Sequence, residues 1–524
     1  MVNQDLVYTP IEKIPSIVRC ARTAFDTGRI RSLDYRRKQL RQLAALIDEN
    51  REALNAALLA DLRKCPNEAQ MCEYMTVKND IADALLNLEK WAAPQAVAKT
   101  PAQMFNRMQI RKDPLGVVLI IGAWNYPFAL TIGPLVGAIA AGNAAIIKPS
   151  EISANIARVI GDLMPKYLDS DAYIVVNGGK DETTALLQER FDHIFYTGSG
   201  VVGRIVMAAA AKHLTPVTLE LGGKSPTFVD ANVDLGAAAR SIVWGRFLNA
   251  GQTCIAPDYI LTYASVRDKL VRELKKAITE MFGEDPQRSP AYCRIVNQNH
   301  FNRVRQLIPS AGVVIGGETD EADLYIAPTV IVDVNPEQPI MKEEIFGPLL
   351  PIMVVDSPDQ AIRFINSRDK PLALYCFSGT SSVIERFATE TSSGGFVGND
   401  VVTHFATPAL PFGGVGPSGM GRYHGKFSFD TFTHDKAYIT GPTFVEKILA
   451  LRYPPFPEFS MTMINLLVAK KVPSPLKIWL SKPATRRSIM YLVLAAAMAA
   501  CVYRIETATP GFWSGLLVFF GIKK

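Results

Sequence analysis

The sequence predicts an α/β protein built on doubly wound, mostly parallel sheets. Three observations support this fold class. Helical patterns alone fill the first part of the chain. From Leu115 onward, short β-branched runs then alternate with helical patterns, and this alternation occurs in two successive stretches. Strands that alternate with helices at this spacing are typical of parallel sheets. A length of 524 residues fits two to four domains.

The residues from about Ile11 to Ala93 are expected to be helical. In their middle, apolar residues recur at steps of three or four, with one step of seven, which is two turns. They are Leu40, Leu43, Ile47, Leu54 and Leu58. This pattern predicts one amphipathic helix packed on a core.

The first alternating stretch runs from Leu115 to Leu214. Its expected strands lie within 115–122, 143–151, 172–179 and 192–203, and its expected helices are 128–142, 154–168 and 204–214. Each strand-like run is short, rich in β-branched residues and closed by a turn residue. This stretch predicts a first parallel sheet.

The second alternating stretch, about 227–394, predicts another α/β domain. After it comes the segment "LPFGGVGPSGMGRYHGKFSFDTF", 410–432. Its glycine density disfavours a helix, so it is expected to form a loop and short strands.

Composition excludes several function classes. The net charge of +6 is too small to indicate nucleic-acid binding. The seven cysteines are scattered, and the six histidines show no ligand spacing. No disulfide framework and no metal site are therefore expected, and the histidines are assigned structural roles. The N-terminus does not resemble a secretory signal.

A glycine motif, "GSGVVG" from Gly198 to Gly203, lies between a predicted strand and a predicted helix. Such a loop lets the diphosphate of a dinucleotide approach backbone N–H groups at a helix N-terminus. A plain strand–helix turn would look the same, so the motif alone is a weak signal.

Cys254 lies among small and polar residues in "NAGQTCIAPD". A structural cysteine is usually found inside an apolar run. Its surroundings favour a thiol that faces solvent or a ligand over an inert core thiol.

Together with "GQTC", four further motifs complete a recognisable set. They are "IGAWNYPF" with Asn125, "IIKPSE" with Lys148 and Glu151, "LELGGKSP" with Glu220, and "KEEIFGP" with Glu344 and Phe346. In this order, from about Ile11 to Tyr438, they resemble the aldehyde dehydrogenase superfamily. "TPVTLELGGKSP" and the glycine-rich segment resemble its class 3, fatty-aldehyde branch.

The resemblance implies that Cys254 is the catalytic nucleophile, which forms a thiohemiacetal and then a thioester with the substrate. Asn125 and the backbone N–H of Cys254 would stabilise the oxyanion. Glu220 is the favoured general base. Glu344 stays open as a second candidate for activating the deacylating water, although binding the nicotinamide ribose is its favoured role.

The resemblance also implies a Rossmann-like site for NAD. Lys148 would bind the adenosine ribose. Glu151 would accept from the 2′-hydroxyl and repel a 2′-phosphate, which favours NAD but leaves NADP possible.

The other expected cofactor contacts come from two loops. Gly198, Ser199 and Gly203 would lie at the diphosphate, and Phe346 would pack against the cofactor. Gly200 departs from the class 3 pattern at this loop.

The C-terminal tail has its own character. No acidic residue occurs between Glu458 and Glu506, and Ser488 to Tyr503 carries no charge before Arg504. A membrane anchor with a basic cytosolic flank is the favoured interpretation. A hairpin that dips into one leaflet and a buried helix stay open. The catalytic part is expected to face the cytosol, at the mitochondrial outer membrane, the endoplasmic reticulum or the peroxisome.

These expectations divide the chain into five parts. They are an NAD-binding domain (1–225, with a bridging segment at about 98–114), a catalytic domain (226–400), a bridging or oligomerisation segment (401–445), a basic linker with a short helix (446–487) and the anchor (488–524). A homodimer is expected, as in family members.

The expected function is oxidation of medium- to long-chain aliphatic aldehydes to carboxylic acids with NAD. Three alternatives stay open: an aromatic aldehyde dehydrogenase, a catalytically silent membrane-bound homologue, and a thiol hydrolase acting on activated esters.

Overall fold

The fold is taken from a computed structural model of the chain. It describes residues 6–444, 446, 449–456, 458–469, 472–483, 485, 488–493, 504, 507 and 509. The chain forms two compact units. One comprises Met1–Ala96 and Gln109–Tyr438, and the other comprises Val97–Met108 and Ile439–Lys524.

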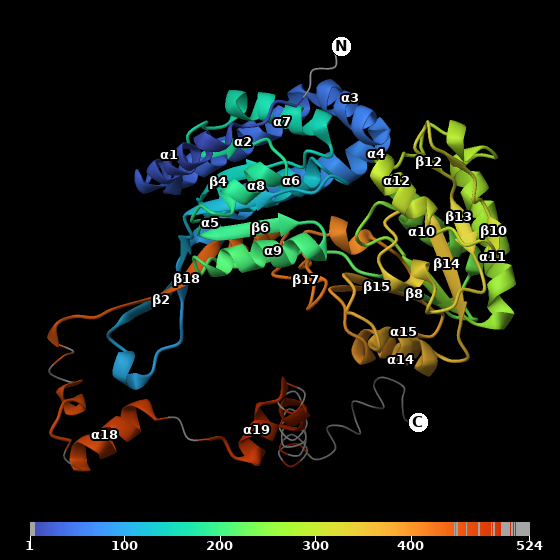
Figure 1. The fold of residues 1–524 in the computed structure, drawn as a ribbon. Helices are drawn as coiled ribbons and strands as arrows, with labels where there is room; N and C mark the ends of the chain where they lie inside the picture. Colours follow the sequence, from blue (N-terminus) through green and yellow to red (C-terminus); the bar gives the residue numbers. More distant parts are fainter. Residues whose placement is uncertain are drawn as a thin grey trace. The chain divides into compact units, whose positions relative to one another are not determined.

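The first unit begins with the expected helices (Figure 1). They are η1 (Ile11–Lys13), α1 (Ile14–Asp26), η2 (Arg29–Arg31), α2 (Leu33–Glu49), α3 (Arg51–Leu62), α4 (Pro66–Ala69), η3 (Gln70–Tyr74) and α5 (Met75–Ala92). All five residues of the predicted apolar stripe are buried. The prediction of one continuous helix is wrong, because non-helical backbone at Asn50, with φ −117° and ψ 24°, separates α2 from α3.

The first sheet has six strands in the order β17-β7-β6-β3-β4-β5. Its strands are β3 (Val117–Ile121), β4 (Ala144–Lys148), β5 (Tyr173–Val175), β6 (His193–Thr197), β7 (Val217–Glu220) and β17 (Gly419–Met420). All pairs are parallel except β17 with β7. Helices lie on both faces (Figure 1): α6 (Ala129–Ala141), α7 (Ala154–Tyr167), α8 (Lys180–Leu186) and α9 (Gly200–Ala211). The predicted first parallel sheet is confirmed.

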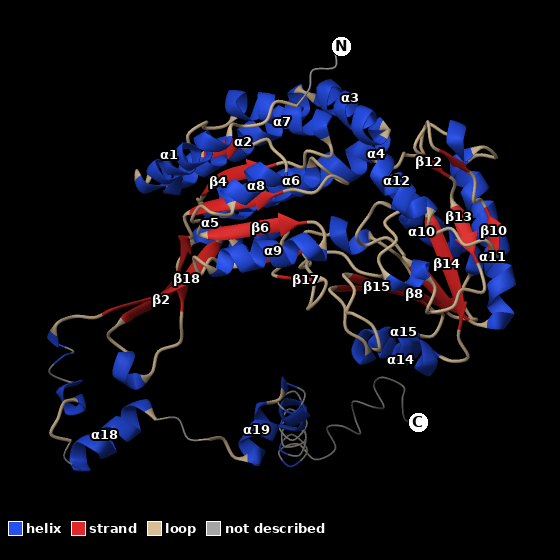
Figure 2. Cartoon of the chain, in the orientation of Figure 1, coloured by secondary structure: helices blue, strands red, loops and turns tan. Residues whose placement is uncertain are grey.

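The second sheet has seven strands in the order β10-β13-β14-β9-β8-β15-β16 (Figure 2). They are β8 (Pro226–Val229), β9 (Tyr259–Thr262), β10 (Val313–Ile315), β13 (Thr329–Ile331), β14 (Leu349–Val354), β15 (Ala373–Phe377) and β16 (Gly395–Gly398). Only β10 runs antiparallel to its neighbour. The remaining elements are α10 (Leu235–Phe247), η5 (Leu248–Gly251), α11 (Ala264–Phe282), η6 (Pro286–Arg288), α12 (Gln298–Arg305), β11 (Thr319–Asp320), β12 (Tyr325–Ile326), α13 (Pro339–Lys342), α14 (Pro358–Asn366), α15 (Ser381–Glu390) and η7 (Thr403–Ala406). The second predicted α/β region is confirmed.

The glycine-rich segment differs from its prediction. Its glycines do form loops and the short strand β17, but α16 (Gly425–Thr431) is a helix packed on α5 and α6. Only one glycine, Gly425, lies within α16, and Asp80 accepts a hydrogen bond of 3.0 Å from its N–H. Phe429 is buried, so packing outweighs the low helix propensity of the segment.

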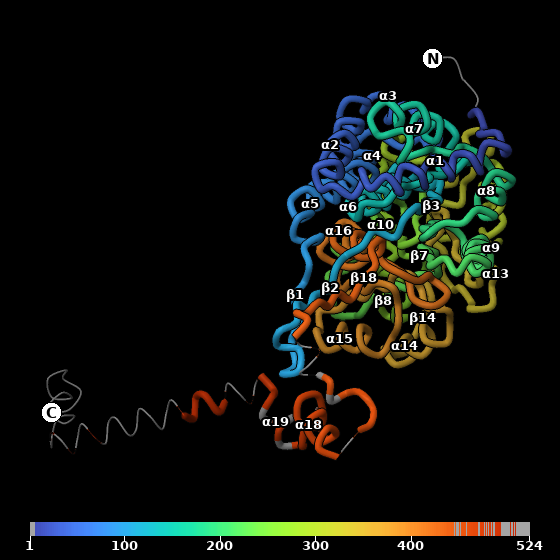
Figure 3. Tube along the Cα trace, turned by 90° about the vertical axis from the view of Figure 1, so that its left-hand side faces the viewer, coloured from blue at the N-terminus to red at the C-terminus, as the bar shows by residue number. Residues whose placement is uncertain are grey.

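A small three-stranded sheet accompanies this region. It consists of β1 (Gln95–Ala96), β2 (Arg107–Pro114) and β18 (Thr433–Thr440), which lie side by side in Figure 3. The segments 98–114 and 401–445, expected to bridge, thus supply β2 and β18. The segment 401–445 also supplies β17 to the first sheet. The predicted domain boundaries stay a prediction.

The second unit is described by itself. It contains η4 (Pro101–Gln103), η8 (Leu449–Arg452), α18 (Glu458–Val468) and α19 (Pro475–Ser481). Within the described part of the chain, no helix has both the length and the apolar character needed to cross a membrane. Most of the expected anchor, 494–503 and 510–524, lies outside the described residues.

Candidate active site

Cys254 follows a tight loop after α10. Asn249 and Ala250 adopt left-handed φ values of 52° and 51°, and Gly251 follows at 75°. A Cβ at Gly251 would lie 2.3 Å from the carbonyl oxygen of Gly347, so only glycine fits there. The thiol is half-buried. Burial raises the pKa of Cys254, and the negative charges of Glu344 and Glu220 raise it further. A nearby base must therefore assist in forming the thiolate.

Gln252 holds this loop in place. Its Nε2 donates to the carbonyl oxygens of Asn249 (2.9 Å) and Arg294 (3.0 Å), and its Oε1 accepts from the N–H of Val296 at 2.9 Å. Gln252 was missed in the sequence analysis, although it stands two residues before Cys254 in the "GQTC" motif. A buried amide with all these bonds fixes the backbone that presents the thiol.

Asn125 lies on the loop between β3 and α6 and reaches the same backbone. Its Nδ2 donates to the carbonyl oxygen of Gln252 at 3.0 Å. An amide nitrogen carries two hydrogens, so one remains for a substrate oxygen. The structure thus brings Asn125 to the loop that carries Cys254.

Glu220 ends β7 and is buried, with 3% of its surface exposed. Neither carboxylate oxygen has a hydrogen-bond partner among the described residues. Burial holds the pKa of Glu220 well above its ordinary value. An unpartnered buried carboxyl is costly in stability, which points to a functional reason for keeping it.

Glu344 lies beside the turn that follows Glu220. A Cβ at Gly222 would be 2.2 Å from Glu344 Oε2, so glycine leaves the space that the carboxylate occupies. Burial, with the charge of Asp258 as a smaller cause, raises the pKa of Glu344 to about 8. Both predicted carboxylates therefore influence the charge state of one thiol, Cys254.

Phe346 shares the loop of Glu344. Arg303 on α12 holds this loop by donating to the carbonyl oxygen of Ile345 at 2.6 Å. Phe346 has a left-handed φ of 49°, and its ring meets that of Trp124 edge to face at 5.2 Å. Trp124 directly precedes Asn125, so the two predicted loops are in contact.

Lys148 is the last residue of β4, and Glu151 lies three residues beyond it. Their side chains form an ion pair of 2.6 Å, and Lys148 is almost fully buried. Asn125, Lys148 and Glu220 therefore follow or end three parallel strands of one sheet. Carboxyl ends of parallel strands form the ligand edge of such sheets.

The glycine motif occupies the same edge, between β6 and α9. Ser199 is the N-cap of α9, and its hydroxyl accepts from the N–H of Val202 at 3.4 Å. A Cβ at Gly198 would collide with the Tyr196 hydroxyl, and one at Gly203 would collide with Leu221. The glycines thus allow α9 to pack closely, and its N-terminus stays available to a diphosphate.

The N-terminal segment contributes a residue that the sequence analysis missed. The N–H of Thr9 donates to the carbonyl oxygen of Asn177 at 2.8 Å. This bond places Tyr8 beside Gly179, whose Cβ position would be 3.6 Å from the Tyr8 ring and 3.9 Å from Glu151 Cγ. No local pattern around Tyr8 could have indicated this long-range contact.

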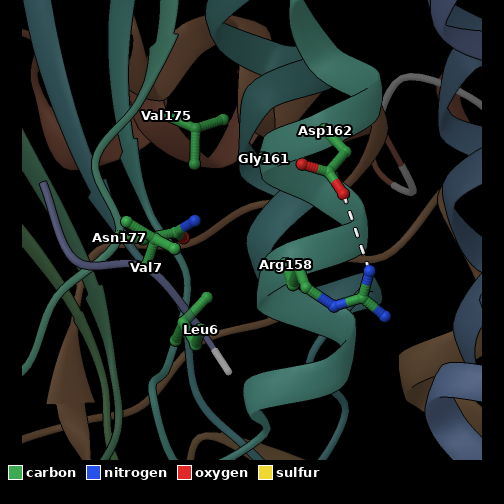
Figure 4. Close-up of a pocket in the computed structure, with 7 residues that line it drawn as sticks. All are labelled: Leu6, Val7, Arg158, Gly161, Asp162, Val175 and Asn177. Atoms are coloured by element: carbon green, nitrogen blue, oxygen red, sulfur yellow. Dashed lines mark ion pairs between the residues drawn. The ribbon is translucent and has the colours of Figure 1, made fainter. Parts of the chain in front are cut away.

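A surface cavity of about 510 Å³ lies next to this segment (Figure 4). Its lining residues are Leu6, Val7, Arg158, Gly161, Asp162, Val175 and Asn177. None of the predicted catalytic residues lines it, so it is separate from the thiol.

Tyrosines around Cys254 were also missed. Tyr126 shares a 2.6 Å hydrogen bond with Thr253, and Tyr375 donates to the carbonyl oxygen of Ile255 at 2.5 Å. Burial raises the pKa of Tyr423, and the charges of Glu220 and Cys254 raise it further. Aromatic residues are common in cores, so their sequence positions alone gave no signal.

The glycines at the N-terminus of α9, at the carboxyl edge of a parallel sheet, indicate a site for a dinucleotide. The thiol of Cys254 beside the carboxyls of Glu220 and Glu344 indicates an oxidoreductase that forms a covalent intermediate. The model of the aldehyde dehydrogenase family matches residues 8–438, and the chain belongs to this family. It is an NAD(P)-dependent aldehyde dehydrogenase, which confirms the predicted family, enzyme class and cofactor type.

The similar proteins include several from family 3. The chain is 49% identical to aldehyde dehydrogenase family 3 member A2 of Rattus norvegicus, covering 93% of this chain and 99% of the relative. It is 52% identical to the dimeric NADP-preferring aldehyde dehydrogenase of Rattus norvegicus, covering 85% and 99%. It is 51% identical to family 3 member B1 of Homo sapiens, covering 85% and 95%. The predicted class 3 resemblance is confirmed.

Solved structures agree with this assignment. The substrate-bound AldH of Staphylococcus aureus superimposes with a TM-score of 0.84 at 44% identity, covering 86% of this chain and 99% of that one. An indole-3-acetaldehyde dehydrogenase in complex with NAD+ gives a TM-score of 0.77 at 25% identity, covering 84% and 93%.

Proposed function

We propose that this protein oxidises medium- to long-chain aliphatic aldehydes to carboxylic acids with NAD, and that Cys254 is the nucleophile. One observation carries the catalytic part. A half-buried thiol lies within electrostatic reach of the buried carboxyl of Glu220 and the partly exposed carboxyl of Glu344, and its loop is hydrogen-bonded to the amide of Asn125.

The reaction begins at the thiol. Cys254 loses its proton and attacks the aldehyde carbon, and the carbonyl double bond becomes a C–O⁻ single bond. The side-chain amide of Asn125 and the backbone N–H of Cys254 donate to this oxyanion. One such donor is worth about 3 kcal/mol in the transition state.

The substrate carbon then loses a hydride and becomes a thioester. When bound, the nicotinamide supplies the hydride acceptor. A water molecule attacks the thioester, and a carboxylate takes its proton, which releases the acid and the thiol. Overall, one aldehyde, one NAD+ and one water give one acid, one NADH and one proton.

Glu220 is the better placed base. Both of its oxygens are buried without a partner among the described residues, whereas for Glu344 this holds only of Oε1. The backbone N–H of Gly223 also favours the charged form of Glu344 and lowers its pKa. A free carboxylate can accept a proton from water without breaking an existing bond. Glu344 and Phe346 would instead hold the nicotinamide half of NAD.

The adenosine half would be held by Lys148 and Glu151, and the diphosphate by the loop of Gly198, Ser199 and Gly203. The Lys148–Glu151 pair presents a carboxylate at the ligand edge. A carboxylate there repels a 2′-phosphate, so NAD is preferred and NADP remains usable.

The proposed substrates and location rest on the tail. In the described part of the second unit, large apolar side chains are exposed, including those of Phe456, Phe459, Met461, Leu466, Val472 and Trp479. The uncharged run 488–503 follows a basic stretch. We expect the tail to bind membrane lipid while the catalytic part faces the cytosol. Long-chain aldehydes concentrate in lipid at about 0.8 kcal/mol per buried CH2, so enzyme and substrate meet there.

The proposed assembly is a homodimer. One relative carries "dimeric" in its name, and β2 and β18 form a small sheet suited to bridging subunits. Sedimentation of the detergent-solubilised protein would test this state.

A substrate panel tests the function. NADH formation should have the highest kcat/KM with aliphatic aldehydes of about eight carbons or more, and C254A should abolish it while NADH still binds. A preference for benzaldehydes would instead support the aromatic alternative. Substantial turnover by C254A would exclude this thiol as the nucleophile.

A further inference from the structure

The segment from Lys64 to Tyr74 contacts both loops of the active site. It contains the short helix α4 and the π turn η3. Its charged side chains Lys64 and Glu73 are fully buried, and Glu68 is nearly so. Buried charges are costly unless they are paired and hydrogen-bonded.

Lys64 and Glu73 hold the Asn125 loop from two sides. Lys64 Nζ donates to Glu73 Oε1 at 2.6 Å and to the carbonyl oxygen of Asn125 at 3.0 Å. Glu73 Oε2 accepts from the backbone N–H groups of Phe128 (3.2 Å) and Ala129 (2.9 Å). One ion pair thus fixes the middle of the loop that carries the oxyanion donor and its junction with α6.

A second link reaches the loop of the nucleophile. Glu68 Oε1 accepts from the N–H of Asn249 at 3.0 Å. Asn249 Nδ2 then donates to the carbonyl oxygens of Asn125 (2.8 Å) and Gln252 (3.2 Å). The carbonyl oxygen of Asn125 therefore accepts from two side chains, Lys64 and Asn249, and only that of Lys64 is charged.

The π turn explains how Glu68 and Glu73 can serve one site. In an α-helix, residues five apart point about 140° away from each other. The bond from the N–H of Met75 to the carbonyl oxygen of Gln70 closes a wider turn of five residues. Residues five apart then come closer to one face, and π turns are frequent at functional sites.

We propose that Lys64 and Glu73 are positioning residues that aim the side-chain amide of Asn125 at the substrate oxyanion. This inference rests on the proposed role of Asn125. Lys64 and Glu73 touch neither substrate nor cofactor, and they act through the backbone at Asn125, Phe128 and Ala129.

The test separates reactions that need an oxyanion donor from one that does not. Aldehyde oxidation and cofactor-free hydrolysis of 4-nitrophenyl acetate both place negative charge on an oxygen. Alkylation of Cys254 by iodoacetamide is a displacement at a CH2 group and does not. Misplacing a donor should slow only the first two reactions.

The main variant is K64M/E73Q, made in the full-length protein. It removes both buried charges together. The side-chain amide oxygen introduced at position 73 can still accept from Phe128 and Ala129, so folding is better preserved than in K64M alone. We expect kcat and ester hydrolysis to fall about 10- to 100-fold. The Kd for NADH, read by fluorescence, and the alkylation rate of the Cys254 peptide, read by mass spectrometry, should change less than twofold.

A matched control uses another nearly buried lysine. Lys112 pairs with Asp430 and Asp435 at 2.9 and 2.6 Å and contacts neither active-site loop. K112M should leave kcat within twofold. If K64M/E73Q does not fold, E73Q alone keeps the test, because Lys64 then loses its carboxylate and its hold on Asn125 weakens.

A double-mutant comparison completes the design. In an N125A background, K64M/E73Q should cause little further loss, because the group that it aims is absent. A full additional loss, an equal loss of alkylation, or unchanged kcat in a folded variant would each overturn the positioning role. If N125A itself leaves both oxyanion reactions intact, the proposed role of Asn125 fails instead.

Discussion

At the scale of single residues, Gly222 shows how a missing side chain shapes the site. Its absent Cβ leaves space for Glu344 Oε2, which would otherwise lie only 2.2 Å away. In G222A the carboxylate must move. If Glu344 binds the nicotinamide ribose, losing this charged hydrogen bond should weaken NADH binding about tenfold or more. Fluorescence titration measures this change.

Gly236 in the first turn of α10 offers the control. A Cβ there would meet only side-chain atoms of Asp234, Glu273 and Arg240, at 3.4 Å or more. G236A should therefore bind NADH nearly as well as the unmodified protein. Equal binding by G222A would show that Glu344 is not a cofactor ligand.

Glu344 also predicts a pH dependence of stability. Its pKa is raised from 4.5 to about 8 in the folded protein. The folded state therefore binds its proton more tightly than the unfolded state. The resulting stabilisation is complete below pH 4.5 and is lost as the pH rises through 8.

E344Q removes this contribution. Between pH 5 and pH 8, without cofactor, the free energy of unfolding should fall by about 1–2 kcal/mol more in the unmodified protein than in E344Q. Partial exposure of the Glu344 side chain keeps this difference in the free energy of unfolding small. Thermal unfolding at a series of pH values measures the difference, and parallel curves would contradict it.

At the scale of elements, β17 secures the strand that carries Glu220. Gly419 pairs directly with Glu220, and its φ is 137°. A Cβ there would lie 2.0 Å from the carbonyl oxygen of Leu219. In G419A, β17 should separate from β7. Overpacking should lower the free energy of unfolding by about 1–3 kcal/mol, backbone strain should lower it further, and kcat should fall.

G416A separates strain from collision. Gly416 also has a positive φ, 62°, but its Cβ would meet only Lys370 Cδ at 4.0 Å. Its thermal unfolding temperature should fall less than that of G419A. Equal losses would mean that the contact with Leu219 does not matter.

The elements also show what sequence can reveal. The β-branched runs that became the strands of both sheets were predictable, because local periodicity marks buried strands. The break between α2 and α3 at Asn50 could not be predicted. The step from Ile47 to Leu54 equals two helical turns, so the apolar pattern continues across the break. Helix α16 was missed because its stability comes from packing on α5 and α6, far away in sequence.

The site shows the same division. Motifs indicated Cys254, Asn125, Glu220 and Glu344, because the proposed chemistry requires those side chains. The supporting residues Lys64 and Glu73 have no signature, since their importance lies in partners up to 61 positions away. Contacts across the fold, rather than spacing along the chain, determine such roles.

At the scale of the whole molecule, the catalytic part and the tail should be separable. The proposed catalytic residues all lie in the unit that ends at Tyr438. Deleting the residues after Lys482 should therefore release an active enzyme from membranes, with kcat within about twofold for short aldehydes. Flotation with vesicles of phosphatidylcholine and phosphatidylserine measures the binding.

The outcome for long aldehydes is informative too. With vesicles present, the full-length protein should oxidise hexadecanal more efficiently than the shortened one, because both partners are concentrated at the surface. A shortened protein that still floats with vesicles would place the lipid contact before Lys482, where the exposed apolar side chains from Phe456 to Trp479 remain.

The N-terminal segment has a practical consequence. Thr9 is tied to Asn177, and Tyr8 lies against Gly179 beside Glu151. Any domain fused ahead of Met1 is tethered within about 18 Å of Leu6, because five residues reach no farther at full extension. If Glu151 binds the adenosine ribose as proposed, a reporter attached there can reach that end of the bound dinucleotide. Affinity handles and fluorophores on this chain should therefore be compared for their effect on NAD binding before use.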